Sequence, residues 1–224
     1  EAQLAGLARL TDPTGPSEDI RLAVFEDLAA ACLAPLLAHA ARHAPDLRIT
    51  AQVMGFEALA QALTHGRADL ALTWDLGLES SIARRVLARI APQAVLAPDH
   101  PLAAKSALCL QDLSDQPLIL ADQGLSIGHM RALFAQKGLP MQIRHRTASL
   151  DLMRSYAANG LGVGLSYTNP ATSHSHDGKP LTLRVLTDAG TEPLILAHLA
   201  QNPPSAAALR LAALLPASLP ESLR

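Results

Sequence analysis

The sequence predicts an α/β fold, and three observations lead to this prediction. Ile20–Phe25 is a short apolar run typical of a buried strand, and Leu28–His43 carries apolar residues at helical spacing. Arg48–Met54 alternates like a strand with one wetter face, Phe56–His65 is a short amphipathic helix, and Ala68–Trp74 is a third, mostly apolar strand. Three strands joined by two helices predict a parallel sheet with right-handed crossovers.

Capping and turn residues predict where these elements begin and end. Asp27 is expected to be the N-cap of the first helix, because its carboxylate can accept the free N–H groups of the first turn. Pro45 is expected to end that helix, and Gly66 to follow the second helix as a left-handed cap. Glu1–Leu10 has the pattern of a helix end, and Thr11–Ser17, with two prolines and a glycine, has that of a linker. We therefore expect the chain to be the C-terminal piece of a longer protein.

The second half of the chain repeats the strand–turn–helix theme, which suggests two similar α/β lobes. The chain is expected to cross to the second lobe within Ile82–Pro98. Ser126, Ser149 and Ser205 are each expected to cap a helix. We predict strands at 84–90, 93–97, 118–121, 141–146, 181–186 and 194–199, a turn and strand at 160–166, and helices at 110–113, 126–137, 150–159 and 206–215.

The composition argues against several classes of function. The formal net charge of −2 provides no electrostatic footprint for nucleic acid or an anionic membrane. No apolar run approaches the roughly 20 residues that span a bilayer, and the N-terminus lacks the basic and apolar regions of a signal peptide. Cys32 and Cys109 lie among Leu and Ala residues, which favours small apolar fillers over a disulfide. We therefore expect a cytoplasmic protein with no membrane partner.

Four short motifs, in their order and spacing, resemble one known family. They are His-Ala-Pro-Asp-Leu-Arg-Ile (43–49), Leu-Thr-His-Gly-Arg-Ala-Asp-Leu-Ala-Leu (63–72), Leu-Ala-Pro-Asp-His-Pro-Leu-Ala (96–103) and Ala-Ala-Asn-Gly-Leu-Gly-Val-Gly-Leu (157–165). From about Ile20 to Leu215 the chain is similar to the effector-binding domain of LysR-type transcriptional regulators.

This resemblance implies two Rossmann-like lobes joined by two crossover strands, as in type II periplasmic binding proteins. Lobe I would comprise residues 20–91 and 191–224, lobe II residues 92–190, and residues 1–19 would be the end of a linker helix and a linker. A small-molecule effector would bind in the cleft between the lobes. A winged helix-turn-helix module that is absent from this chain would bind DNA.

The ends of strands and the starts of helices, together with the resemblance, predict the residues of the cleft. Such positions contact ligands because the carboxyl ends of parallel strands and the N-termini of helices meet at one edge of a sheet. The predicted ligand-binding residues are Phe25, Glu26, Asp27, Gly55, Phe56, Trp74, Asp75, Pro92, Asp122, Ser126, Ile127, Ser149, Gly162, Val163, Gly164 and Leu165.

Two adjacent acids, Glu26 and Asp27, bear on the class of effector. The resemblance implies a Ser or Thr near this point that helps to hold a carboxylate ligand, whereas two acids in a partly desolvated cleft would repel one. Either they bind an amine, an amino acid or a polyol, or Asp27 only caps its helix and Glu26 faces solvent. Trp74, the only tryptophan, either stacks on a ligand or closes the core, and Ser126 and Ser149 either donate to a ligand or only cap helices.

Other motifs argue against cofactors, metals and catalysis. The glycines of Gly160–Gly164 follow a helix and enter a strand, the reverse of a dinucleotide fingerprint, so they predict a tight turn and close backbone packing. The histidine pairs at 39 and 43 and at 174 and 176 lack the further ligands that complete a metal site. We expect no cofactor and no metal, and no acid–base pair indicates turnover.

Three functions compete for this sequence. The leading hypothesis is the effector-sensing domain of a LysR-type regulator. A solute-binding protein for transport has the same fold, and a small deaminase or dehydratase on this scaffold is the third possibility, against which the missing acid–base pair counts. A homodimer or tetramer is expected, because the Leu28–His43 helix carries an Ala/Leu surface wider than one buried stripe requires.

Overall fold

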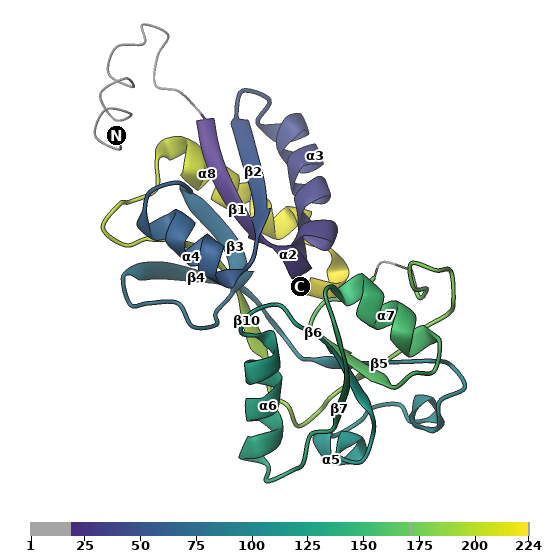
Figure 1. Cartoon of the computed structure of the whole chain (residues 1–224). Helices are drawn as coiled ribbons and strands as arrows, with labels where there is room; N and C mark the ends of the chain where they lie inside the picture. The colour runs from purple at the N-terminus through teal and green to yellow at the C-terminus, as the bar shows by residue number, and fades with distance from the viewer. Residues whose placement is uncertain (1–18, 171, 224) are drawn as a thin grey trace, which may run out of the picture.

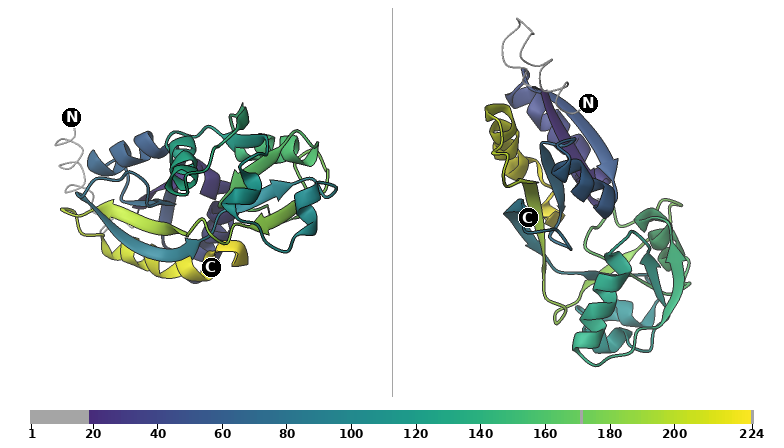
Figure 2. Two further views of the ribbon diagram at one scale, coloured as in Figure 1. Left: turned by 90° about the horizontal axis from the view of Figure 1, so that it is seen from below. Right: turned by 60° about the vertical axis from the view of Figure 1, so that its left-hand side comes forward.

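The computed structural model describes residues 19–170 and 172–223, which form two lobes arranged end to end (Figures 1 and 2). Each lobe contains one five-stranded mixed sheet. The predicted helix end at 1–10 and the linker at 11–17 lie outside the described residues. The predicted α/β fold of the type II periplasmic-binding-protein kind is confirmed.

The sheet of lobe I has the strand order β2-β1-β3-β10-β4. Its strands are β1 (Asp19–Phe25), β2 (Arg48–Met54), β3 (Leu70–Trp74), β4 (Ile82–Ile90) and β10 (Glu192–Leu199). β1 pairs in parallel with both β2 and β3, whereas β10 is antiparallel to β3 and β4. Helix α4 (Phe56–Thr64) covers one face, and α3 (Ala34–His43) packs against α8 (Ala206–Ser218) on the other (Figure 1). The parallel βαβαβ unit predicted from the sequence is therefore present.

The sheet of lobe II has the corresponding order β7-β6-β8-β5-β9. Its strands are β5 (Gln93–Leu96), β6 (Leu118–Ala121), β7 (Ile143–Thr147), β8 (Val163–Ser166) and β9 (Thr182–Val185), and its helices are α5 (Leu110–Leu113), α6 (Ser126–Gln136) and α7 (Leu150–Ala158). Short 3-10 turns lie at Pro101–Ala104 and Glu221–Leu223. The chain crosses between the lobes from β4 to β5 and again from β9 to β10, so two segments of the chain join the lobes (Figure 1).

The first helix begins differently from the prediction. It starts at Glu26 in the short segment α2 (Glu26–Leu28), and its N-cap is Phe25, which has extended backbone angles and no side-chain cap. Asp27 is therefore not the N-cap but lies inside the first turn, because a cap is a backbone conformation that the last residue of the strand already supplies. A π-helical turn, Ala29–Leu33, then leads into α3.

The predicted serine caps have different outcomes. Ser149 and Ser205 cap α7 and α8 by accepting hydrogen bonds from the N–H groups of Leu152 (3.3 Å) and Ala208 (3.1 Å). Ser126 does not cap α6, because it already lies in the helix. Its hydroxyl accepts from the Gln123 N–H at 3.1 Å and donates to the Ala121 carbonyl at 2.8 Å. This hydroxyl therefore fixes the turn that carries the chain from β6 into α6.

The glycine-rich turn before β8 brings two segments of backbone together. Gly162 has a φ of +150°, and a Cβ built on it would lie 2.2 Å from the carbonyl oxygen of Pro117. A Cβ on Gly164 would lie 2.1 Å from the buried Met153 Sδ. These contacts explain why glycine occupies both positions and agree with the close packing predicted from the sequence.

Candidate functional site

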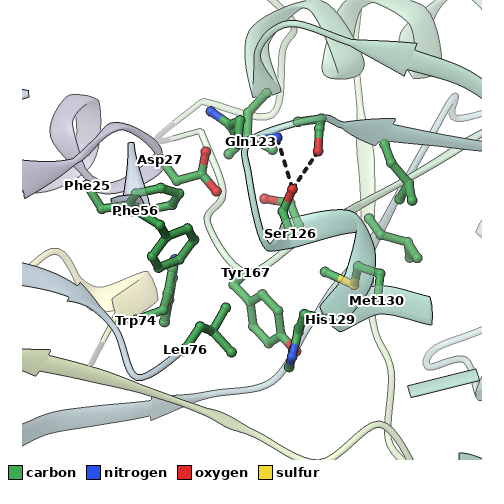
Figure 3. Close-up of a pocket in the computed structure, with 15 residues that line it drawn as sticks. Phe25, Asp27, Phe56, Trp74, Leu76, Gln123, Ser126, His129, Met130 and Tyr167 are labelled. Carbon is green, nitrogen blue, oxygen red and sulfur yellow. Dashed lines mark hydrogen bonds between the residues drawn. The ribbon is translucent and has the colours of Figure 1, made fainter. Parts of the chain in front are cut away.

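A cavity lies between the two lobes, and residues of both lobes line it (Figure 3). It contains about 460 Å³ of space between side chains, part of it open to solvent. The lining residues are Phe25, Asp27, Phe56, Trp74 and Leu76 of lobe I and Leu120, Ala121, Gln123, Ser126, His129, Met130, Leu150, Leu165, Ser166 and Tyr167 of lobe II. Each group follows the carboxyl ends of the parallel strands, where a ligand site is expected in such sheets.

Aromatic rings form much of the wall of this cavity. The chain has only three Phe, one Trp and two Tyr residues, and four of these six side chains line the cavity. The rings of Phe25 and Phe56 have centroids 4.0 Å apart, and those of Trp74 and Tyr167 are 5.4 Å apart. A protein so poor in aromatic residues has gathered most of them at one site, which suits an apolar or aromatic ligand body.

Polar acceptors lie at one end of the cavity, where Asp27 and Gln123 approach each other from opposite lobes (Figure 3). The Oδ1 atom of Asp27 and the Oε1 atom of Gln123 are fully enclosed and have no hydrogen-bond partner among the described residues. Burial raises the pKa of Asp27 to about 7, a side-chain hydrogen bond with Gln123 and the charge of Arg154 oppose the rise, and the charge of Glu26 adds to it. Two enclosed acceptors without donors are costly, so this end is suited to a ligand that donates hydrogen bonds.

A second polar group lies toward the other end of the cavity. The His129 Nε2 atom and the Tyr167 hydroxyl are 2.7 Å apart and form a hydrogen bond. The same Nε2 atom is 3.5 Å from Oε2 of Glu192, at the start of β10. Burial lowers the pKa of His129 and raises the pKa values of Tyr167 and Glu192, the last to about 7. This cluster links α6 of lobe II to a crossover strand.

Arg154 of α7 is the positively charged residue that lowers the pKa of Asp27, although it does not line the cavity. Its guanidinium donates to Asp151 Oδ1 at 3.1 Å and to the Thr168 carbonyl at 2.7 Å, and its side chain is 9% exposed. Burial lowers the pKa of Arg154 itself. Arg154 does not line the cavity, so it offers a ligand no direct ion pair in this arrangement.

The residues predicted for the cleft are only partly brought together. Phe25, Asp27, Phe56, Trp74, Ser126 and Leu165 line the cavity. The remaining predicted residues lie outside its lining: Glu26, Gly55, Asp75, Pro92, Asp122, Ile127, Ser149, Gly162, Val163 and Gly164. Two of these acids have ion-pair partners instead, since Asp75 Oδ1 is 2.7 Å from Arg84 Nε and Asp122 Oδ2 is 3.7 Å from Arg146 Nη1.

Sequence reasoning missed several lining residues, most of them in lobe II. Gln123 lies two residues past the end of β6, and Tyr167 directly follows β8. His129 and Met130 follow Ser126 at helical spacings of three and four, which places all three on one face of α6. Extending the strand-end rule by two residues, and following Ser126 along its helix face, would have found them.

The described residues contain no group of three or more His, Cys, Asp and Glu side chains that could hold a metal ion. Between residues 19 and 223, residue 171 aside, there is also no helix long and apolar enough to cross a membrane. His39 and His43 stack with ring centroids 4.0 Å apart on the exposed side of their helix, where Nδ1 of His43 contacts the His39 carbonyl.

Comparison with known proteins identifies relatives over most of the chain. A family model described as the LysR substrate binding domain matches residues 13–220. A probable nitrogen assimilation transcriptional activator of Synechococcus elongatus is 23% identical over 168 residues, which are 73% of this chain and 54% of that protein. The chain spans about half the length, or less, of the curated relatives it matches.

Solved structures show the same architecture. HinK, a LysR family transcriptional regulator from Pseudomonas aeruginosa, is 27% identical, with a TM-score of 0.84 over 96% of this chain and 75% of that one. The effector-binding domain of BenM, solved with its effector benzoate, is 22% identical, with a TM-score of 0.74 over 88% of this chain and 90% of that domain.

Proposed function

The chain belongs to the LysR substrate-binding-domain family, and we propose that it senses a small-molecule effector in the cavity between its lobes. The observation that carries this proposal is the cavity itself, which both lobes line with an aromatic wall and with enclosed, unpartnered acceptors. An apolar lining with a few converging polar groups is typical of sites that bind small molecules. The benzoate complex of BenM supports effector binding in a domain of the same fold.

The proposed mechanism is a shift in population between arrangements of the lobes. An effector that contacts Asp27 and Gln123 touches both lobes at once and so favours one arrangement over the others. A differential affinity of about 1–3 kcal/mol suffices for such regulation. In the full-length protein, an N-terminal winged helix-turn-helix would convert this shift into altered DNA binding. We propose a cytoplasmic regulator that binds its effector without turning it over.

The effector is proposed to be an amine, an amino acid or another small metabolite. The test is a panel of cationic, neutral and anionic metabolites, followed by thermal unfolding and by emission of Trp74, the only tryptophan and part of the cavity wall. At least one compound is expected to raise the melting temperature, perturb Trp74 emission and be recovered unchanged. A panel without any such compound would contradict effector sensing.

The family match favours a regulator over a transport protein of the same fold. The coding sequence upstream of Glu1 discriminates between the two. An upstream helix-turn-helix supports the regulator, whereas a secretory signal peptide supports solute binding for transport.

We propose that two copies of the chain associate through β2 and α3. β2 is an edge strand of the lobe I sheet, and its Val53 is 51% exposed. The neighbouring α3 exposes a run of small apolar residues, Ala34, Pro35, Ala38 and Ala41. An open strand edge beside such a face is a natural pairing surface.

Light scattering tests this interface with a matched pair of variants. The wild-type chain is expected to have the mass of two copies, and Val53→Lys to have that of one, because a buried lysine opposes pairing. Val86→Lys is the control, since Val86 is 49% exposed on β4, the opposite edge of the same sheet. A monomeric wild type at high concentration, or equal effects of the two variants, would rule the interface out.

A further inference from the structure

The two enclosed acceptors of the cavity define what a ligand must supply. Asp27 Oδ1 and Gln123 Oε1 belong to opposite lobes, and within the described part of the chain neither has a donor. Gln123 is only 8% exposed, so water does not readily satisfy its amide. A ligand group with at least two N–H donors between them would satisfy both atoms, whereas a carboxylate would add further acceptors to the same end.

The charged groups around the cavity also favour one sign of charge on the ligand. Among the fifteen lining residues there is no Lys or Arg, and Asp27 is the only acid. Arg154 does not line the cavity, and its two terminal nitrogens donate to Asp151 and Thr168, although its buried Nε has no partner among the described residues. His129 is bonded to Tyr167, and burial lowers its pKa and so favours the neutral ring. A carboxylate in the cavity would therefore lack a counterion, and a cation would find one.

The aromatic wall suits a cation for a second reason. Phe25 and Phe56 adjoin Asp27 in the cavity, and Trp74 and Tyr167 continue the wall beyond them (Figure 3). Ring faces attract organic cations, most strongly where water is displaced. A buried carboxyl group beside several rings is the arrangement that recognises ammonium groups with apolar substituents.

From these contacts, and resting on the proposed sensing function, we propose that the effector is an organic ammonium ion without a carboxylate. Its N–H groups lie between Asp27 and Gln123, and its apolar or aromatic body lies against Phe25, Phe56 and Trp74. The proposal narrows the effector class from amines and amino acids to amines, because the cavity lining offers no cation for an α-carboxylate.

The protonation of Asp27 supports this assignment and gives it a distinct signature. The charged groups that act on Asp27 are Glu26 on its own helix and Arg154 on α7. With the pKa of Asp27 raised to about 7, its ionised fraction rises from about one tenth at pH 6 to about nine tenths at pH 8. An aliphatic ammonium ion stays protonated over this range, so its affinity should rise about ninefold between these pH values.

Three probes of nearly equal shape test the proposal: benzylamine, benzyl alcohol and benzoate. Trp74 fluorescence and thermal unfolding of the whole chain report binding. Benzylamine is expected to bind most tightly, to bind about ninefold more tightly at pH 8 than at pH 6, and to lose about tenfold or more in affinity in Asp27→Asn. Glu57→Gln removes an exposed acid from the first turn of α4, outside the cavity lining, and should leave benzylamine binding unchanged.

The outcomes separate this inference from the proposed function. If benzoate or benzyl alcohol binds as well as benzylamine, the ammonium assignment is wrong and sensing in the cavity stands. Benzylamine binding that is equal in Asp27→Asn and wild type, or that does not change with pH, also overturns the assignment. If no probe binds, and phenethylamine does not bind either, the assignment fails; only a failure of the wider metabolite panel contradicts sensing itself.

Discussion

Gly162→Ala is expected to destabilise the protein by about 3 kcal/mol or more, the largest loss of stability expected of any substitution proposed for this chain. Two costs combine at this position. The φ of +150° strains any residue with a Cβ, and the new methyl group would lie 2.2 Å from the backbone oxygen of Pro117. A backbone oxygen cannot rotate away as a flexible side chain can, so the β6–β8 region of lobe II would have to separate.

Gly160→Ala is the matched control for this substitution. Gly160 lies in the same turn with a φ of +75°, but a Cβ there meets no atom within 4 Å. The Gly160→Ala substitution should lower the free energy of unfolding only by the conformational strain, which is about 1 kcal/mol. Urea unfolding of both variants gives the comparison, and equal losses of stability would show that contact with Pro117 contributes nothing.

Asp27→Asn is expected to stabilise the protein by about 4 kcal/mol at pH 8 and by less than about 1 kcal/mol at pH 4. The pKa of Asp27 rises from 3.8 in the unfolded chain to about 7 in the folded protein. The folded state therefore holds a proton that the unfolded state releases between these values. The contribution of Asp27 to wild-type stability is therefore greatest below about pH 4 and falls as the pH rises through 7, and Asp27→Asn removes this pH-dependent loss.

Denaturant unfolding at pH 4, 6 and 8 measures this difference. Burial also raises the pKa of Glu192 to about 7, but Glu192 is present in both proteins, so their difference isolates Asp27. Glu57→Gln, which removes an exposed acid, should change little at any pH. If Asp27→Asn is less stable than the wild type at pH 8, the Asp27 carboxylate is favourably paired in the folded protein and this prediction is wrong.

The two roles of Asp27 are linked. If its carboxyl group costs stability in the empty protein and also binds the effector, then the substitution that stabilises the fold removes the ligand site. Such a trade-off between stability and function is common where a site holds an unsatisfied polar group.

Much of the fold could be predicted from the sequence because it follows local rules. The strands predicted at 118–121 and 93–97, observed as Leu118–Ala121 and Gln93–Leu96, are apolar runs bounded by turn residues. Ser149 and Ser205 precede apolar helices, so pattern and capping agree. The parallel β2-β1-β3 arrangement followed from the alternation of strands and helices.

The parts that could not be predicted depend on tertiary contacts. Phe25 serves as the N-cap although its side chain makes no cap bond, so no residue type marked the helix start. Ser126 was predicted to cap α6, but its hydroxyl instead forms hydrogen bonds with the backbone of Ala121 and Gln123 in the turn after β6. The enclosure of Gln123 requires both lobes to be in place, and the bond between His129 and Tyr167 joins residues that lie 38 positions apart, so no local pattern encodes either feature.

The two connections between the lobes differ in length, and this difference has a mechanical consequence. Only Ala91 and Pro92 separate β4 from β5, whereas residues 186–191 separate β9 from β10. The first is a taut tether, stiffened further because proline fixes its own φ. The second is longer, but its first half is held to lobe II and to the first connection. The Leu186 N–H donates to the Pro92 carbonyl, the Thr187 N–H donates to the Leu108 carbonyl, and the Asp188 carboxylate accepts from the Leu110 N–H. Because the two connections are bonded side by side, we expect the lobes to rotate about this point rather than slide, so that a bound molecule sets an angle of rotation.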